Sequence, residues 1–183
     1  MQLPPITILD EKDKRLHQIS KEVVFPLSQE DKKNIKDMLT YLKMSQMDDY
    51  NEKYQLRAGM GLSYVQIGIL KRIFVVVDEV EDNVFQDYVL INPKIISNSE
   101  ELIYVGEGEG CLSINRPTEG IIPRYARITV EAYDVEGKKF TIRVREDLSV
   151  AFQHEMDHLN GILFTDKIDP KAPYKNQEKM REI

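Results

Sequence analysis

The chain has 183 residues, which at roughly 150 residues per domain predicts one domain spanning residues 1–183. Its hydrophobic fraction of 42% and charged fraction of 31% are typical of a globular protein and exclude a disordered chain or a collagen-like fibre. A net charge of −6 without a long Lys/Arg run argues against nucleic-acid specificity, and no apolar run is long enough to suggest a membrane span.

Residues 1–27 contain three prolines and predict an irregular N-terminal arm. The first residues lack a basic region followed by an apolar stretch, so we expect no secretory signal. The single cysteine rules out an intramolecular disulfide, which fits a reducing, cytoplasmic location.

A helix is expected after Ser28, a residue type that commonly caps helix N-termini. Apolar residues then recur at i, i+3, i+4 and i+7, which predicts one amphipathic helix of about 20 residues. These residues are Ile35, Met38, Leu39 and Leu42. The polar stretch 45–57 has no such period and is expected to be an inserted loop.

The middle of the chain predicts short β-strands separated by Gly and Asn-Pro. They are expected at 72–78, 88–92, 102–105, 127–134 and 139–144. Gly137 is expected to join the last two as a hairpin.

Near the end, Asp147 is expected to cap a helix that Gly161 terminates. The order of elements predicts an α+β fold, with antiparallel sheets packed around this C-terminal helix and an N-terminal amphipathic helix beside them. Residues 170–183 are expected to form a polar surface tail.

The strongest local signal is the pentapeptide HEMDH at 154–158. On a helix, His154 and His158 lie one above the other and can bind the same metal ion, with Glu155 placed to act as a general base on a water. The alternative is a solvated helix face that carries two unrelated histidines.

A third ligand is needed for a catalytic metal site. The metzincin pattern requires histidine at position 164, which is Phe164. A zinc endopeptidase of the thermolysin type could use Glu178, whereas Cys111 follows two alternating glycines and is the favoured ligand. The alternative for Cys111 is a small buried hydrophobic residue.

The segment GMGLSYVQ at 59–66 fits neither a dinucleotide fingerprint nor a phosphate-binding loop. Gln66 is either an ordinary exposed amide or a donor that stabilises an oxyanion near a metal. Two further classes remain open at this point: a non-catalytic metal-binding protein, and a cysteine hydrolase with Cys111 as nucleophile.

Together the segments at 59–66, EGCLS at 109–113 and QHEMDHLNG at 153–161 resemble the three motifs of the peptide deformylase family, in the family's order. The resemblance extends from Ser28 to about Asp169, and the insertion before Gly59 is similar to the Gram-positive-type subfamily. One departure is Ser63-Tyr64-Val65, where the family usually has Ala-Ala-Pro; the larger Tyr64 puts the packing of this loop and the pocket rim in question.

The resemblance implies an enzyme that removes the formyl group from the N-terminal formyl-methionine of new polypeptides and releases formate. The implied ligands of one divalent metal ion are Cys111, His154 and His158. Ferrous iron is expected, with zinc, nickel or cobalt as replacements. A metal-bound water would attack the formyl carbonyl with Glu155 as general base and acid, while Gln66 and the backbone N–H of Leu112 stabilise the oxyanion.

Residues next to these motifs are candidates for contact with the substrate. Val150 and Ala151 precede His154 on its side of the helix and could form walls of a pocket for the methionine side chain, although both could equally be core. Met60 and Gly61 could flank the substrate, and Gly61 and a strand at Gly110 could pair with its backbone as an added strand. The expected partners are N-formyl-methionyl peptides, contact with the ribosome near the nascent-chain exit stays open, and we expect a monomer.

Overall fold

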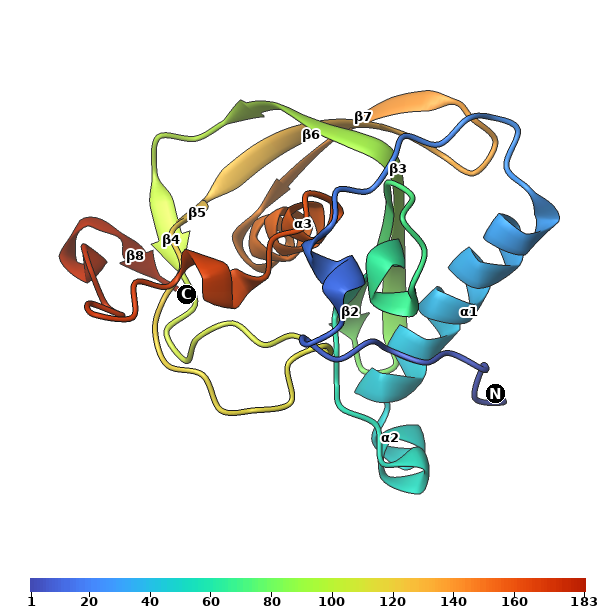
Figure 1. Ribbon diagram of the computed structural model, residues 1–183, viewed down its shortest axis with the longest axis horizontal. Helices are drawn as coiled ribbons and strands as arrows, with labels where there is room; N and C mark the ends of the chain where they lie inside the picture. The colour runs from blue at the N-terminus through green and yellow to red at the C-terminus, as the bar shows by residue number, and fades with distance from the viewer.

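The computed structural model describes residues 1–183 and has an α+β architecture (Figure 1). A five-stranded antiparallel sheet has the order β1 (Gly61–Ser63), β2 (Ile73–Glu81), β3 (Val84–Asn98), β6 (Arg127–Tyr133) and β7 (Lys139–Arg145). A second sheet has the order β5 (Arg124–Tyr125), β4 (Leu102–Tyr104) and β8 (Arg181–Glu182). The helices are α1 (Gln29–Gln46), α2 (Asp48–Tyr54) and α3 (Glu146–Leu159), with short 3-10 turns at η1 (Lys14–His17), η2 (Tyr64–Ile67), η3 (Phe164–Lys167) and η4 (Gln177–Lys179).

The first five residues of strand β2 are buried on both faces and separate two hydrophobic cores. Its residues Ile73, Val75 and Val77 pack in the core that includes α1. The alternate residues Phe74 and Val76 belong to the core beneath α3. Because side chains alternate across a strand, one continuous apolar run serves both helices, and β2 and β3 lie between α1 and α3 (Figure 1).

Helix α1 confirms the expected N-terminal amphipathic helix. The Ser28 hydroxyl accepts a 3.0 Å hydrogen bond from the backbone N–H of Asp31, so Ser28 is the N-cap. Ile35, Met38 and Leu42 are fully or nearly fully buried, as their spacing predicts.

The expectation of a loop at 45–57 is wrong, because this stretch contains α2. None of the residues of α2 is buried. A helix that is polar all round lacks the apolar period that identifies helices from sequence, which explains the error.

Helix α3 confirms the expected C-terminal helix and ends as predicted. The Gly161 backbone has a φ of 73°, and a Cβ at this position would lie 2.8 Å from the backbone of His17, so glycine is required here. The expected cap is wrong: the helix follows Arg145 without a side-chain cap, and Asp147 lies in its first turn.

Residues 1–27 are irregular except for η1, as expected, but Leu16, Val23 and Leu27 are buried against the body of the protein. The β6–β7 hairpin is also confirmed, with a positive φ at Gly137. Strand β3 is much longer than the run expected at 88–92.

Residues 170–183 lie at the surface, as expected, but they do not form a free tail. Strand β8 pairs in parallel with β4, and Arg181 forms ion pairs of 2.8 Å with Glu101 and 2.7 Å with Glu146. These long-range contacts hold the C-terminus against the second sheet. No helix of the structure has the length and apolar character that a membrane span requires.

Candidate active site

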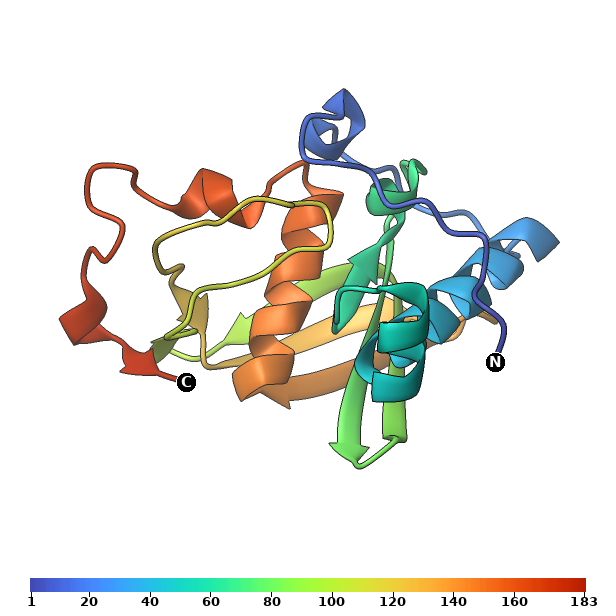
Figure 2. The same cartoon turned by 90° about the horizontal axis from the view of Figure 1, so that it is seen from below.

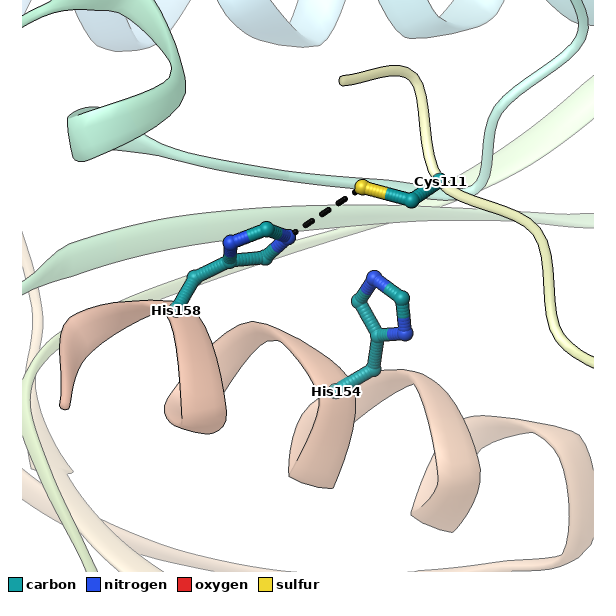
Figure 3. Close-up of side chains that lie close together, drawn as sticks. All are labelled: Cys111, His154 and His158. Atoms are coloured by element: carbon teal, nitrogen blue, oxygen red, sulfur yellow. Dashed lines mark hydrogen bonds between the residues drawn. The ribbon is translucent and has the colours of Figure 1, made fainter. Parts of the chain in front are cut away.

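Three potential metal ligands converge at the middle of the molecule. His154 and His158 lie one turn apart on α3, and Cys111 lies in the irregular segment 105–123, which passes beside this helix (Figure 2). The Cys111 Sγ is 3.4 Å from His158 Nε2, and all three side chains point toward a common centre (Figure 3). One donor atom of each residue lies within 4.8 Å of the other two.

These distances suit a metal ion with tetrahedral coordination. With metal–sulfur and metal–nitrogen bonds of about 2.3 and 2.0 Å, two tetrahedral ligand atoms lie about 3.5 Å apart. The observed sulfur–nitrogen distance of 3.4 Å agrees with this value. Two imidazoles and one thiolate leave a fourth position for water or substrate, which is the composition of a catalytic site.

A buried ion pair orients the first of the two histidines. The Nδ1 atom of His154 is 2.9 Å from Glu109 Oε1, which leaves Nε2 free for a metal. Arg124 donates two 2.8 Å hydrogen bonds to the same carboxylate. Despite burial, the hydrogen bonds from His154 and Arg124 lower the pKa of Glu109 to about 2, so this carboxylate stays ionised.

The ion pair continues to Asp157, whose role the sequence did not reveal. Asp157 accepts a 2.6 Å hydrogen bond from Arg124 and lies 3.0 Å from the Lys167 amine. The guanidinium of Arg124 is therefore bonded to two carboxylates inside the protein, where an unpaired charge would be very unfavourable.

The two histidines differ in their affinity for a proton. Burial opposes the charged form of His154, but the neighbouring Cys111 and the hydrogen bond to Glu109 outweigh burial and raise its pKa to about 10. Burial and the charges of His154 and Arg124 lower the pKa of His158. A divalent ion at the centre would take the place of the His154 proton, because a coordinating imidazole nitrogen must be unprotonated.

The segment that carries Cys111 is held by Arg57. Its guanidinium donates 3.0 Å hydrogen bonds to the backbone oxygens of Cys111 and Ile114 and a 2.7 Å bond to Asn115 Oδ1. The backbone N–H of Leu112 donates no hydrogen bond within the chain and can serve a ligand.

Glu155 is adjacent to the potential ligands and is only 4% exposed. Burial raises its pKa to about 7, despite a lowering effect from His154 and from the hydrogen bond with Ser63. A carboxyl group with a pKa near neutrality can both accept and release a proton under physiological conditions.

Gln66 is not the exposed surface amide that was one of two alternatives, since only 1% of it is exposed. Its Oε1 accepts a 2.9 Å hydrogen bond from the Ser63 backbone N–H. This bond turns the Nε2 atom toward Cys111 Sγ at 3.5 Å and Ser113 Oγ at 3.1 Å. The amide donor therefore faces the potential metal centre.

A cavity of about 510 Å³ opens beside these groups. Ten of the eleven residues singled out from the sequence line it: Met60, Gly61, Gln66, Gly110, Cys111, Leu112, Val150, Ala151, His154 and Glu155. His158 lies behind them and is 1% exposed. Gly110 is not part of a strand, contrary to expectation, because segment 105–123 is irregular there. Glu178 is exposed in η4 and does not belong to the cluster of ligands.

Tyr64 does not narrow this cavity. Its side chain is fully buried in the core that includes α1, and its hydroxyl donates a 2.9 Å hydrogen bond to the backbone oxygen of Asp31. The large residue is accommodated beneath α1, away from the potential ligands.

No pattern in the sequence assigns a role to Ser63, Glu109, Arg57 or Arg124. Glu109 was visible as the first residue of the EGCLS segment, two positions before Cys111. The sequence around the two arginines does not indicate that they belong to the site, because their partners are distant in the sequence and arginine is usually a surface residue.

The family model described as polypeptide deformylase matches residues 5–174. The chain belongs to the peptide deformylase family. The family recognised from the three motifs is thus confirmed, as are the predicted fold and the prediction of a metal-dependent hydrolase.

Curated peptide deformylases include close relatives of this chain. The peptide deformylase of Macrococcus caseolyticus is 47% identical over 162 residues, covering 87% of each chain. Peptide deformylase 2 of Bacillus anthracis is 42% identical over 167 residues, covering 91% of each chain. Among solved structures, the peptide deformylase of Ehrlichia chaffeensis in complex with actinonin is 32% identical, with a TM-score of 0.74 over 93% of this chain and 92% of that one.

Proposed function

We propose that this chain removes the formyl group from the N-terminal formyl-methionine of newly made polypeptides and releases formate. The observation that carries the proposal is the convergence of Cys111, His154 and His158 beside Glu155 and Gln66 at one cavity. Membership of the deformylase family supports the same reaction.

Cys111, His154 and His158 would hold one divalent metal ion. Ferrous iron is the ion we infer, and the same donor set would accept zinc, nickel or cobalt. When bound, such an ion lowers the pKa of water and polarises a carbonyl oxygen.

Glu155 is the general base and acid of this reaction. Its carboxylate takes a proton from the water that attacks the formyl carbon, and it returns this proton to the amine nitrogen as the carbon–nitrogen bond breaks. The raised pKa of about 7 suits both steps, because the group binds and releases a proton near neutral pH.

Gln66 and Leu112 stabilise the negative charge that develops on the formyl oxygen. The Gln66 Nε2 is aimed by the hydrogen bond that its Oε1 receives from the Ser63 backbone. The free backbone N–H of Leu112 supplies a second donor beside Cys111. Fixed donors of this kind stabilise a transition state without reorganising during the reaction.

The methionine side chain would occupy the part of the cavity lined by Val150 and Ala151. Met60, Gly61 and Gly110 would lie along the peptide backbone, and the absence of side chains at the glycines permits close approach. We infer that the enzyme works as a monomer in the cytoplasm, on chains emerging near the ribosomal exit, without specific contacts to nucleic acid. The net charge of −6 supports the last point.

The reaction is tested with a short formyl-Met peptide, using protein loaded anaerobically with ferrous iron and an acetyl-Met peptide as control. We expect formate from the first peptide, no acetate from the second, and no cleavage of internal peptide bonds. Full metal occupancy without formate release would contradict the proposal and favour a metal-binding protein, whereas internal cleavage would favour an endopeptidase.

A further inference from the structure

Ser63 lies between the two side chains to which the proposed function gives chemical roles. Its backbone N–H bonds to Gln66, and its hydroxyl is 2.8 Å from Glu155 Oε2 and 2.9 Å from the Glu155 backbone oxygen. The Ser63 side chain is fully buried. This is the first of the three positions at which the chain departs from the Ala-Ala-Pro usual in the family.

The Glu155 carboxyl group packs against strand β1. Gly61 and Ser63 are two residues apart, so they face the same side of the strand, toward α3. A Cβ on Gly61 would overlap Glu155 Oε1, so only glycine leaves room for the carboxyl there. The carboxyl therefore lies over Gly61 with its second oxygen bonded to Ser63.

Ser63 is the only residue that hydrogen bonds with the Glu155 carboxyl. The other two acidic residues near the centre have arginine partners: Glu109 and Asp157 both bind Arg124. The orientation of the Glu155 carboxyl is thus set by one hydroxyl and by contact with Gly61.

We propose that Ser63 is a positioning residue, whose hydroxyl holds the Glu155 carboxyl group in its place beside the cavity. This inference rests on the proposed function of Glu155. When the carboxyl is charged, the Ser63 hydroxyl donates to Oε2.

The Ser63 hydroxyl keeps its proton and acts only through hydrogen bonding, since Oε2 and the backbone oxygen of Glu155 both lie within 2.9 Å of it. An alanine at this position would leave the carboxyl without a hydrogen-bonding partner, and the carboxyl could rotate away from the reacting water.

The test compares Ser63→Ala with the wild-type protein and with Ser149→Ala. Alanine is the residue usual in the family at position 63, so this variant is expected to fold and to keep a measurable part of the activity. Ser149 is also a buried residue, on α3 itself, and its hydroxyl bonds to the Tyr125 backbone oxygen at 2.7 Å without contacting Glu155. Ser149→Ala therefore controls for the loss of a buried hydroxyl.

In Ser63→Ala we expect kcat for the formyl-Met peptide to fall about tenfold and KM to change by less than about twofold. The reason is that a misplaced catalytic group slows the chemical step. Metal content is expected to stay at one ion per chain. Ser149→Ala is expected to keep the wild-type kcat and KM. An unchanged kcat in Ser63→Ala, or a rise in KM alone, would overturn the inference.

A second comparison asks whether Ser63 acts through Glu155. In a Glu155→Ala background, measured at high enzyme concentration, adding Ser63→Ala should lower the residual rate no further. A further tenfold loss would show that Ser63 acts through Gln66 or packing instead. If wild-type protein releases no formate, the proposed function fails; if it does and Ser63→Ala matches it, only the present inference fails.

Discussion

Arg124 and Glu109 form a two-point ion pair in the interior, with two hydrogen bonds of 2.8 Å and side-chain exposures of 2% and 4%. The same carboxylate binds His154 Nδ1. A charged group that is almost fully shielded from solvent thus fixes the ring of a proposed metal ligand.

Glu109→Gln should weaken both the fold and the metal site. Removing one partner of a buried pair typically costs about 3–5 kcal/mol, and loss of a partner behind a metal-binding histidine lowers metal affinity about 10- to 100-fold. Denaturant unfolding and competition with a chelator measure the two effects. As a control, Glu11→Gln breaks the exposed pair with Arg116 and should cost less than about 1 kcal/mol. Unchanged metal affinity in Glu109→Gln would contradict the role given to this carboxylate.

Tyr64 should matter for stability and not for the reaction. Tyr64→Ala removes a fully buried ring and should cost about 3–5 kcal/mol, whereas Tyr64→Phe loses only the hydrogen bond to Asp31 and should cost about 1 kcal/mol. For Tyr64→Phe we expect kcat and KM close to wild type. A large change in KM for this variant would mean that Tyr64 shapes the pocket rim after all.

Metal loading should stabilise the fold. A free metal concentration one thousand times the dissociation constant contributes about 4 kcal/mol, or roughly 8 to 16 °C in Tm for a chain of this size. Cys111→Ser should lose most of this shift, because it removes the thiolate. Glu178→Gln should retain it, since Glu178 is exposed in η4 and lies outside the cluster of ligands. The opposite pattern would restore the endopeptidase alternative.

Asp78 should destabilise the fold at neutral pH. Burial, followed by the charge of Asp147, raises its pKa, so the folded state binds the Asp78 proton more tightly than the unfolded state. Stability contributed by this proton is present at low pH and is lost as pH rises through the folded-state pKa. Asp78→Asn should therefore stabilise the protein at pH 7 by less than about 1 kcal/mol and have little effect in acid. Urea unfolding at both pH values is the measurement, and an equal effect at both would contradict this explanation.

The sequence revealed most of the proposed site because its groups are encoded locally. His154, Glu155 and His158 share one helix, and Cys111 stands in a short glycine-containing motif. The helical period alone places the two imidazoles on one face. Nothing local connects Arg124 to Glu109, or the Ser63 hydroxyl to Glu155, because these contacts exist only after β1, segment 105–123 and α3 have packed together.

The fold was predictable where burial imposes a period and unpredictable elsewhere. Helix α1 was predictable from the spacing of its buried residues Ile35, Met38 and Leu42. Helix α2 has no buried residue and therefore no hydrophobic period in its sequence. Strand β8 is two residues long and exists through its pairing with β4, about 80 positions away in the sequence. Such short strands depend on their neighbours more than on their own composition.

The most direct test of the account combines formate release and metal content in one sample of Glu155→Ala. The carboxyl is proposed to move the proton and not to hold the metal, so the variant should retain one metal ion per chain and lose formate release by at least about 100-fold. Formate release at the wild-type rate, with metal retained, would contradict the central claim that Glu155 is the general base beside a Cys111, His154 and His158 metal centre.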